Sequence, residues 1–211
     1  MIKLLSHNLT LPILLVIAIS VIIIAIKKNR TSKKALSSQV SVIEDWKDVL
    51  VEKPEYENIK TGNHILFFHN YQCPFCKSVN SKIEKLKEEY DFNVSYYNRV
   101  FANDENIIKS SLAVECAKEQ NIFQDYKNLL YDNFANLGET DFTKLAYQSG
   151  IQDTSKFRIC LENQEKLPIL HRDTRIADSL GITEVPTLII NGKMITGVAN
   201  SELLEYLLSI N

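Results

Sequence analysis

The stretch ILFFHNYQCPFCKSVNSKIEKLKEEY, residues 65–90, decides the fold. Its first five residues are apolar, aromatic or histidine, and the run predicts a buried strand over 65–69. From residue 77 onward the composition becomes charged, and apolar residues recur at intervals of four and three, which marks one face of a helix over 77–90. Those apolar residues are Val79, Ile83 and Leu86. A strand therefore ends, and a helix begins, within a few residues of each other.

Two cysteines occupy this junction, in the order Cys73-Pro74-Phe75-Cys76. With Cys73 near the N-cap and Cys76 one turn in, the sulfurs can form a small disulfide ring without moving the backbone. Pro74 suits the first helical position, because its missing N–H costs nothing there. The unpaired N–H groups and the helix dipole favour a thiolate on Cys73, the attacking species in thiol–disulfide exchange. We therefore expect Cys73 to be the nucleophile and Cys76 the resolving partner.

A C-x-x-C pair can also be half of a zinc site. The other two cysteines, Cys116 and Cys160, are isolated and 44 positions apart, and the chain has no second C-x-x-C and no H-x-x-x-H. The spacing therefore argues against zinc, and we expect neither a metal nor a cofactor. An inert C-x-x-C disulfide is also disfavoured, because so small a loop restrains little of the unfolded chain.

Cys116 and Cys160 both fall in segments with a helical pattern. Buried free cysteines behave as small apolar groups. A second disulfide joining the two helices is an equal alternative, because the number of remaining cysteines is even. The sequence leaves both alternatives open.

The rest of the body follows the order strand, helices, hairpin, helix. A second strand is expected over 92–100, and the segment from 103 to 180 has a helical pattern almost throughout. Helices are expected at 104–119, 122–136, 141–149, 154–163 and 167–180. Asn191-Gly192 then predicts a tight hairpin, because both residues accept positive φ. The closing helix is expected at 201–210, with Ser201 as its N-cap.

The run from Ile182 to Ile190 reads as a strand that contains Pro186. A proline normally confines a strand to the edge of a sheet, because it has no N–H to donate to a neighbouring strand. A cis Val185–Pro186 bond close to the cysteines would instead free a backbone edge for an extended substrate. The alternative is an edge strand that starts at Thr187.

The N-terminus carries an uncharged apolar run, LTLPILLVIAISVIIIAI, at residues 9–26. As a helix it would reach roughly 27 Å, enough to cross a bilayer core, whereas a buried core helix this uniformly apolar is rare. No small-x-small cleavage site ends the run, which favours an uncleaved anchor over a signal peptide in 1–28. Residues 29–61 are expected to form a linker with an amphipathic piece at 42–52, in which Val42, Trp46 and Val49 or Leu50 recur at near-helical spacing.

Charge is distributed unevenly along the chain. Residues 1–34 carry six Lys or Arg and no acid, whereas residues 35–211 carry 18 Lys or Arg against 26 Asp or Glu, a net charge of 18 − 26 = −8. An acidic body excludes nucleic acid as an expected partner. The basic flank at 27–34 favours a cytoplasmic body. The anchor and the four cysteines favour the periplasmic or extracytoplasmic side, and we give these more weight.

Residues 62–211 resemble the DsbA-like thiol–disulfide oxidoreductases of the thioredoxin-fold superfamily. Three pieces carry the resemblance in order: YQCPFC at 71–76, VECAKEQNIFQDYKNLLY at 114–131 and GITEVPTLIINGKMITG at 181–197. The resemblance implies an α/β thioredoxin-like fold interrupted by an all-helical insertion at about 103–180. With the apolar N-terminus, the expected fold is this domain preceded by a transmembrane helix.

The resemblance also implies an activity. Cys73 and Cys76 would cycle between dithiol and disulfide, with Val185 and Pro186 touching substrate and Phe75 lying between the cysteines. The enzyme would oxidise cysteine-containing exported proteins and be reoxidised by a membrane-bound partner. A reductase or isomerase is the first alternative. The second is a redox-inactive surface protein that uses the groove beside Pro186 to bind peptides.

The chain departs from this family at the residue six positions before the first cysteine. Relatives often carry a buried acid there, and this chain has Phe67, with His69 and Asn70 the nearest polar residues. We expect His69 to be a partly buried histidine at the end of the strand rather than a proton carrier. Phe75 brings no positive charge beside the cysteines, so the redox poise stays open.

Overall fold

The computed structural model describes residues 13–24, 27, 40–51, 62–101 and 104–210. The chain consists of two compact units, Met1–Ser41 and Val42–Asn211. The larger unit begins earlier than residue 62, where the sequence analysis placed the start of the domain.

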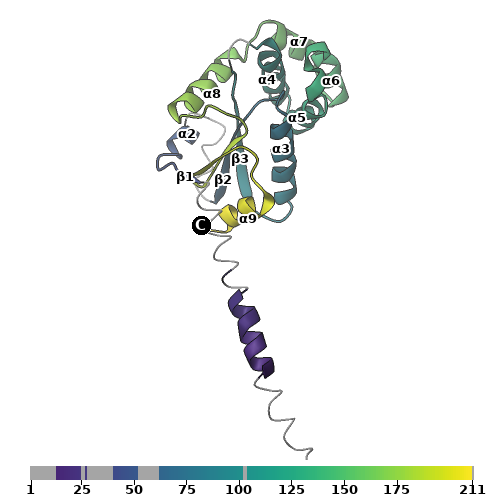
Figure 1. Ribbon diagram of the computed structural model, residues 1–211. Helices are drawn as coiled ribbons and strands as arrows, with labels where there is room; N and C mark the ends of the chain where they lie inside the picture. Colours follow the sequence, from purple (N-terminus) through teal and green to yellow (C-terminus); the bar gives the residue numbers. More distant parts are fainter. Residues whose placement is uncertain (1–12, 25–26, 28–39, 52–61, 102–103, 211) are drawn as a thin grey trace, which may run out of the picture. The chain divides into compact units, whose positions relative to one another are not determined.

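In the described residues, a five-stranded sheet has the order β1-β5-β4-β2-β3 (Figure 1). Its strands are β1 Ser41–Val42, β2 Asn63–His69, β3 Phe92–Asn98, β4 Thr187–Ile190 and β5 Lys193–Thr196. β2 and β3 pair in parallel, with Asn63 opposite Phe92 and His69 opposite Asn98. β4 pairs antiparallel with both β2 and β5. β2 is therefore an interior strand between β4 and β3, and its carboxyl end leads to the cysteines that follow it.

The helices surround this sheet. They are α2 Asp48–Val51, α3 Pro74–Leu86, α4 Glu105–Lys118, α5 Phe123–Asp132, the 3₁₀ helix η2 Phe134–Glu139, α6 Phe142–Gln148, α7 Thr154–Glu162, α8 Leu167–Ser179 and α9 Ser201–Ser209. Helices α4 to α8 separate β3 from β4 in the sequence, as expected for the insertion. Asp104, Asp141 and Asp153 cap three of them by accepting hydrogen bonds from backbone N–H groups of the first turn.

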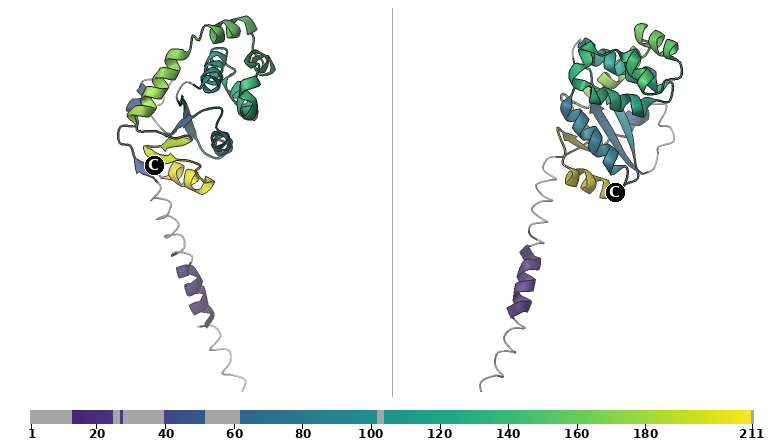
Figure 2. Two further views of the ribbon diagram at one scale, coloured as in Figure 1. Left: turned by 45° about the horizontal axis from the view of Figure 1, so that its top comes forward. Right: turned by 90° about the vertical axis from the view of Figure 1, so that its right-hand side faces the viewer.

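The two faces of the sheet are covered by different helices. Alternate residues of β2 point to opposite faces, and Leu66 and Phe68 pack with Tyr97 of β3 and Ile176 of α8 in one buried cluster. Figure 2 shows α8 and α2 on this side of the sheet and α3 with α9 on the other. The domain is thus a sheet between two helical layers, with the remaining helices forming a separate group at one end.

Most element boundaries agree with the sequence analysis to within a few residues. One expected helix is shorter: α5 ends at Asp132, and η2 replaces its last turn. The expected N-cap of the closing helix was wrong. Asn200 caps α9, because its side-chain oxygen accepts the N–H of Leu203, and Ser201 is the first helical residue.

The expected amphipathic piece at 42–52 was mostly wrong. Val42 ends β1 and is 70% exposed, and within the described residues 42–51 only Asp48–Val51 is helical. Trp46 and Leu50 pack against the cluster that contains Val49, and the carbonyl of Val49 accepts a hydrogen bond from the Tyr97 hydroxyl. Packing against distant residues, rather than one face of a helix, thus explains why Trp46, Val49 and Leu50 are apolar.

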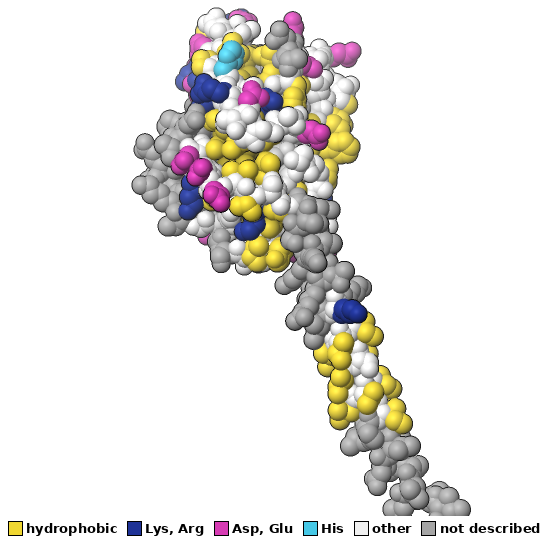
Figure 3. Space-filling view, turned by 60° about the vertical axis from the view of Figure 1, so that its left-hand side comes forward, with side chains coloured by type: hydrophobic (Ala, Val, Ile, Leu, Met, Phe, Trp, Pro, Cys, Tyr) yellow, Lys and Arg dark blue, Asp and Glu magenta, His cyan; other side chains and the backbone are white. Residues whose placement is uncertain are grey.

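The smaller unit contains a helix over residues 13–24. Its large apolar side chains are exposed, and Figure 3 shows them along the face in view. Within the described residues no helix is long and apolar enough to cross a membrane. The expected anchor over 9–26 includes residues 9–12 and 25–26, and the linker includes 29–39 and 52–61, all outside the described residues.

The hairpin between β4 and β5 provides a test of local packing. Gly192 has φ of +82°, and a Cβ there would lie 2.7 Å from Trp46 Cδ1 and 3.0 Å from the Ile43 carbonyl oxygen. We expect Gly192→Ala to lower the free energy of unfolding by about 2–5 kcal/mol, from left-handed backbone strain plus this overlap. Chemical denaturation measures it.

The matched control is Gly150→Ala. Gly150 has φ of +83° but no atom within 4 Å of the built Cβ. This variant carries the backbone strain alone, about 1–2 kcal/mol. Equal losses in the two variants would contradict the packing of residues 43–46 against the hairpin.

Candidate active site

Cys73 lies at the start of α3, directly after the sheet. It is the N-cap residue, with φ −90° and ψ 111°, and Pro74 follows in the first turn. The backbone N–H of Cys76 donates a hydrogen bond of 3.0 Å to Cys73 Sγ. Sulfur therefore takes the place of the oxygen that caps most helices, and an unpaired N–H of the first turn is directed at the thiol.

The two thiols have opposite environments. Both cysteines are free, with Cys73 partly exposed and Cys76 fully buried. A hydrogen bond from the Cys76 side chain lowers the pKa of Cys73 from 9.0 to about 7; burial opposes this effect, and the backbone N–H groups of Cys76 and Phe75 add to it. Burial, together with the neighbouring Cys73 sulfur, raises the pKa of Cys76. One accessible thiol of lowered pKa thus lies beside one buried thiol of raised pKa, which is the arrangement that thiol–disulfide exchange needs.

The loop that contains Val185 and Pro186 lies next to Cys73. Its peptide bond is cis, and the Val185 carbonyl oxygen lies 3.9 Å from Cys73 Sγ as a hydrogen-bond acceptor. The Pro186 carbonyl accepts a hydrogen bond of 2.7 Å from Gly197 N–H. β4 starts at Thr187 but lies inside the sheet, so it is not the edge strand considered as an alternative. Residues 112 positions apart are therefore brought together at one sulfur.

An aromatic layer lies at the end of β2. His69 was expected to be partly buried, but it is completely buried, and its Nδ1 is 2.7 Å from the Tyr131 hydroxyl. Its ring stacks on Phe67 and contacts Tyr71 edge-on, each at 4.9 Å between centroids. Tyr131 comes from α5, and nothing in the sequence pattern singled it out as a partner of His69.

A partly buried ion pair joins the helical insertion to α3. Lys127 of α5 is fully buried, and its Nζ donates to Glu84 Oε1 at 2.9 Å and to the Tyr96 hydroxyl at 2.8 Å. Burial lowers the pKa of Lys127 to about 8 despite the nearby carboxylate. Burial would raise the pKa of Glu84, but the Lys127 ammonium outweighs it and holds that pKa at about 2. Nothing in the sequence distinguished Lys127 from a surface lysine.

A second polar group ties the insertion to the end of β3. The Asn98 side-chain amide donates to Glu115 of α4 at 3.0 Å and to Asp173 of α8 at 3.2 Å. Asp173 also accepts the backbone N–H of Asn98 at 3.0 Å and pairs with Arg172 at 2.9 Å. These contacts hold α4 and α8 against the strand that neighbours β2.

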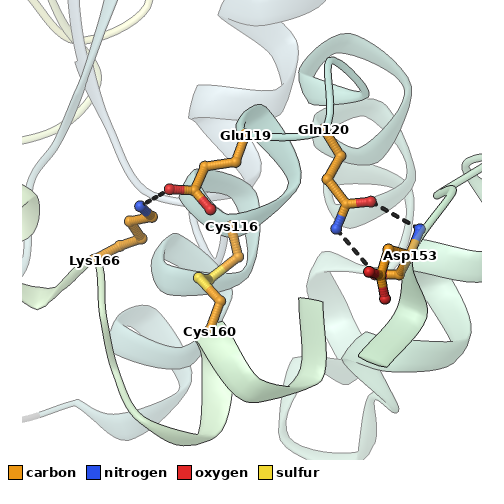
Figure 4. The surroundings of a disulfide bond; sticks show 6 residues. All are labelled: Cys116, Glu119, Gln120, Asp153, Cys160 and Lys166. Atoms are coloured by element: carbon orange, nitrogen blue, oxygen red, sulfur yellow. Dashed lines mark hydrogen bonds and ion pairs between the residues drawn. A yellow bond between two sulfur atoms is a disulfide. The ribbon is translucent and has the colours of Figure 1, made fainter. Parts of the chain in front are cut away.

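The other two cysteines form a disulfide between α4 and α7. Cys116 and Cys160 have Cα atoms 6.0 Å apart and are each 1% exposed (Figure 4). Gln120 and Asp153 exchange two hydrogen bonds of 2.9 Å nearby, and Glu119 pairs with Lys166. Of the two alternatives that the sequence left open, the structure contains the disulfide. Within the described ranges, no three His, Cys, Asp or Glu side chains gather as a metal site.

Comparison with known proteins identifies the fold. A protein-family model described as thioredoxin matches residues 56–209. A thioredoxin-like oxidoreductase from Silicibacter pomeroyi DSS-3 is 18% identical, with 76% of this chain and 94% of that one covered at a TM-score of 0.63. BdbD from Bacillus subtilis is 22% identical, with 69% and 85% covered at 0.59. DsbA2 of Pseudomonas aeruginosa is 24% identical, with 71% and 88% covered at 0.58.

A curated relative matches over a shorter share of its length. The Na(+)/H(+) antiporter NhaA 1 of Mycolicibacterium gilvum is 25% identical over 132 residues, which are 60% of this chain and 21% of that protein. The chain thus spans about a fifth of the curated relative that it matches. The solved structures share the DsbA-like fold, and no residue role follows from identities this low.

The source of the low Cys73 pKa can be tested by alkylation. We expect iodoacetamide to label Cys73 with a pH midpoint of about 7 in the reduced protein. Cys76→Ala removes the side-chain hydrogen bond, so the midpoint should move up toward the ordinary value of 9.0. Cys76→Ser keeps a donor and should shift it less. An unchanged midpoint in Cys76→Ala would show that this hydrogen bond does not control the thiol.

Proposed function

This chain belongs to the thioredoxin family, and we propose that it is a thiol–disulfide oxidoreductase of the DsbA type with Cys73 and Cys76 as its redox pair. One observation carries the proposal. A partly exposed thiol of lowered pKa lies beside a buried thiol at the start of α3, with the Val185 carbonyl 3.9 Å from the exposed sulfur. Sites that only store a disulfide have no need of such an asymmetric pair.

The proposed reaction moves two electrons from substrate to enzyme. A substrate thiolate attacks Cys73 Sγ of the Cys73–Cys76 disulfide, and Cys76 leaves and takes up a proton. A second substrate thiolate then attacks the substrate sulfur of the mixed disulfide, and Cys73 leaves as a thiolate. The substrate gains a disulfide and the enzyme ends with two thiols. The low Cys73 pKa favours the second step, because a more acidic thiol is the better leaving group.

We propose that electrons flow in this direction, from exported proteins to the enzyme. A stabilised Cys73 thiolate favours the reduced enzyme and so makes its disulfide a better oxidant. The Cys116–Cys160 disulfide adds support, because structural disulfides persist in oxidising compartments. Each turnover leaves a dithiol, so an oxidant must restore the disulfide, and we propose that a membrane-bound partner supplies it.

We further propose that residues 9–26 attach the enzyme to a membrane with Val42–Asn211 on the extracytoplasmic side. The exposed apolar side chains of the 13–24 helix support this. The basic flank at 27–34 favours the opposite orientation by charge alone. The redox requirement of the two cysteine pairs outweighs it, because a reducing compartment would hold both pairs as thiols.

The direction of electron flow is tested by equilibrating the full chain with glutathione and trapping the thiols for mass spectrometry. We expect a potential above about −180 mV, toward the value of about −120 mV that marks a strong disulfide donor. A value near that of thioredoxin, about −270 mV, would favour the reductase alternative. Cys73→Ser should abolish exchange, whereas the Cys116→Ala/Cys160→Ala control should retain it. Peptide binding and a cellular phenotype that are both unchanged by Cys73→Ser would favour the redox-inactive peptide-binding alternative.

The compartment is tested by trapping thiols in intact cells with acid and labelling the denatured protein with a maleimide. In the full chain, we expect Cys116 and Cys160 to remain unlabelled until a reductant is added. In a chain that starts at residue 29, both cysteines should be labelled, because without the apolar segment the protein stays in reducing surroundings. Labelling of both cysteines in the full chain would contradict the extracytoplasmic location.

A further inference from the structure

A groove runs along α3, the helix that directly follows Cys73. Its volume is about 410 Å³. The six described residues that line it include three lysines and no acid. They are Pro74, Lys77, Ser78, Ser81, Lys82 and Lys85. The first of these directly follows Cys73 in the sequence, so one end of the groove lies at the start of α3.

Helical spacing explains the shape of this groove. Pro74, Ser78, Ser81 and Lys85 recur at intervals of four and three and form one exposed stripe of α3. Ser78 and Ser81 are small, so the middle of the stripe is low and the longer lysine side chains form its borders. The result is a shallow channel bordered by positive charge.

Two of the lysines are held in place at the borders. Lys77 Nζ pairs with Asp132 of α5 at 2.9 Å, and Lys82 Nζ donates to the Ala199 carbonyl oxygen at 2.7 Å. An ammonium group has three donors, so each lysine can donate to a further acceptor in the groove. Positioning by these contacts reduces the side-chain entropy that each lysine would lose on binding.

The charge of the groove contrasts with the rest of the body. Residues 35–211 have 18 Lys or Arg and 26 Asp or Glu, a net charge of −8, and yet the groove is lined by lysines without an acid. Lys77 is already paired with Asp132, so Lys82 and Lys85 carry the positive charge that would attract an acidic segment to the groove. Charge complementarity of this kind sets specificity and association rate.

We propose that this groove binds acidic residues of the polypeptide whose cysteine reacts with Cys73. The inference rests on the proposed function and names a substrate class for that site. From Pro74 to Lys85 the helix rises about 16 Å, which matches about five residues of an extended chain. A substrate cysteine at Cys73 thus allows acidic side chains within the next few residues to reach Lys77, Lys82 and Lys85.

The test measures the rate at which the full chain, as its disulfide, oxidises three dicysteine peptides. One peptide carries glutamates within five residues of a cysteine, one has glutamines there and one has lysines. We expect the acidic peptide to react about tenfold faster than the neutral one at low salt, since each exposed ion pair adds about two- to fivefold. The preference should disappear between about 0.01 M and 1 M salt, as the screening length falls from about 30 to about 3 Å.

A double variant tests whether the preference for the acidic peptide depends on the groove lysines. Lys82→Gln/Lys85→Gln should lower the rate with the acidic peptide about fivefold and leave the neutral rate unchanged, which also shows that the fold is intact. Lys144→Gln/Lys156→Gln removes the same charge from exposed positions of α6 and α7 and should change neither rate.

The outcomes separate this inference from the proposed function. If the acidic and neutral peptides react equally fast, or the basic one reacts fastest, the groove does not select acidic partners, while disulfide transfer stands. The Lys144→Gln/Lys156→Gln variant could lower the preference for the acidic peptide as much as Lys82→Gln/Lys85→Gln does. The preference would then come from overall charge, and the proposal that the groove binds acidic residues would be wrong. If no peptide is oxidised, the proposed function fails and the substrate class fails with it.

Discussion

The hydrogen bond from the backbone N–H of Cys76 to Cys73 Sγ connects the fold to the chemistry, together with the Cys76 side-chain hydrogen bond that lowers the Cys73 pKa most. The backbone hydrogen bond exists only because β2 ends just before Cys73 and α3 begins just after it, so that sulfur occupies the N-cap. The same turn of helix carries Cys76 into the core while Cys73 stays accessible. The difference between the two thiols is therefore a consequence of where one strand stops and one helix starts.

The remaining architecture fixes that junction from several sides. Val185 approaches Cys73 because β4 pairs with β2, which sets the loop before Thr187 against the start of α3. Underneath, the buried His69–Tyr131 hydrogen bond links the end of β2 to the helical insertion. A reactive sulfur needs a rigid surrounding, because a small displacement changes both its hydrogen bonds and its accessibility.

Polar contacts join the insertion to the sheet alongside the apolar cluster that contains Ile176. Lys127 with Glu84 and Tyr96, and Asn98 with Glu115 and Asp173, each bring side chains of the two parts together in buried surroundings. Buried charges of this kind contribute little net stability but penalise any other arrangement, because a displaced partner leaves a charge unpaired. They thereby set the position of α5 and α8 relative to the strands.

The sequence by itself determined the local features: the strand before the cysteines, the proline-led start of α3, the Asn191-Gly192 turn and the helical nature of 103–180. Each depends on periodicity or backbone preference within a few neighbouring residues. Only the tertiary structure decided that Cys116 bonds to Cys160, that Lys127 is buried against Glu84, and that Trp46 packs on the hairpin. These contacts join residues more than forty positions apart, and their partners are selected by the packing of whole elements, which no local pattern encodes.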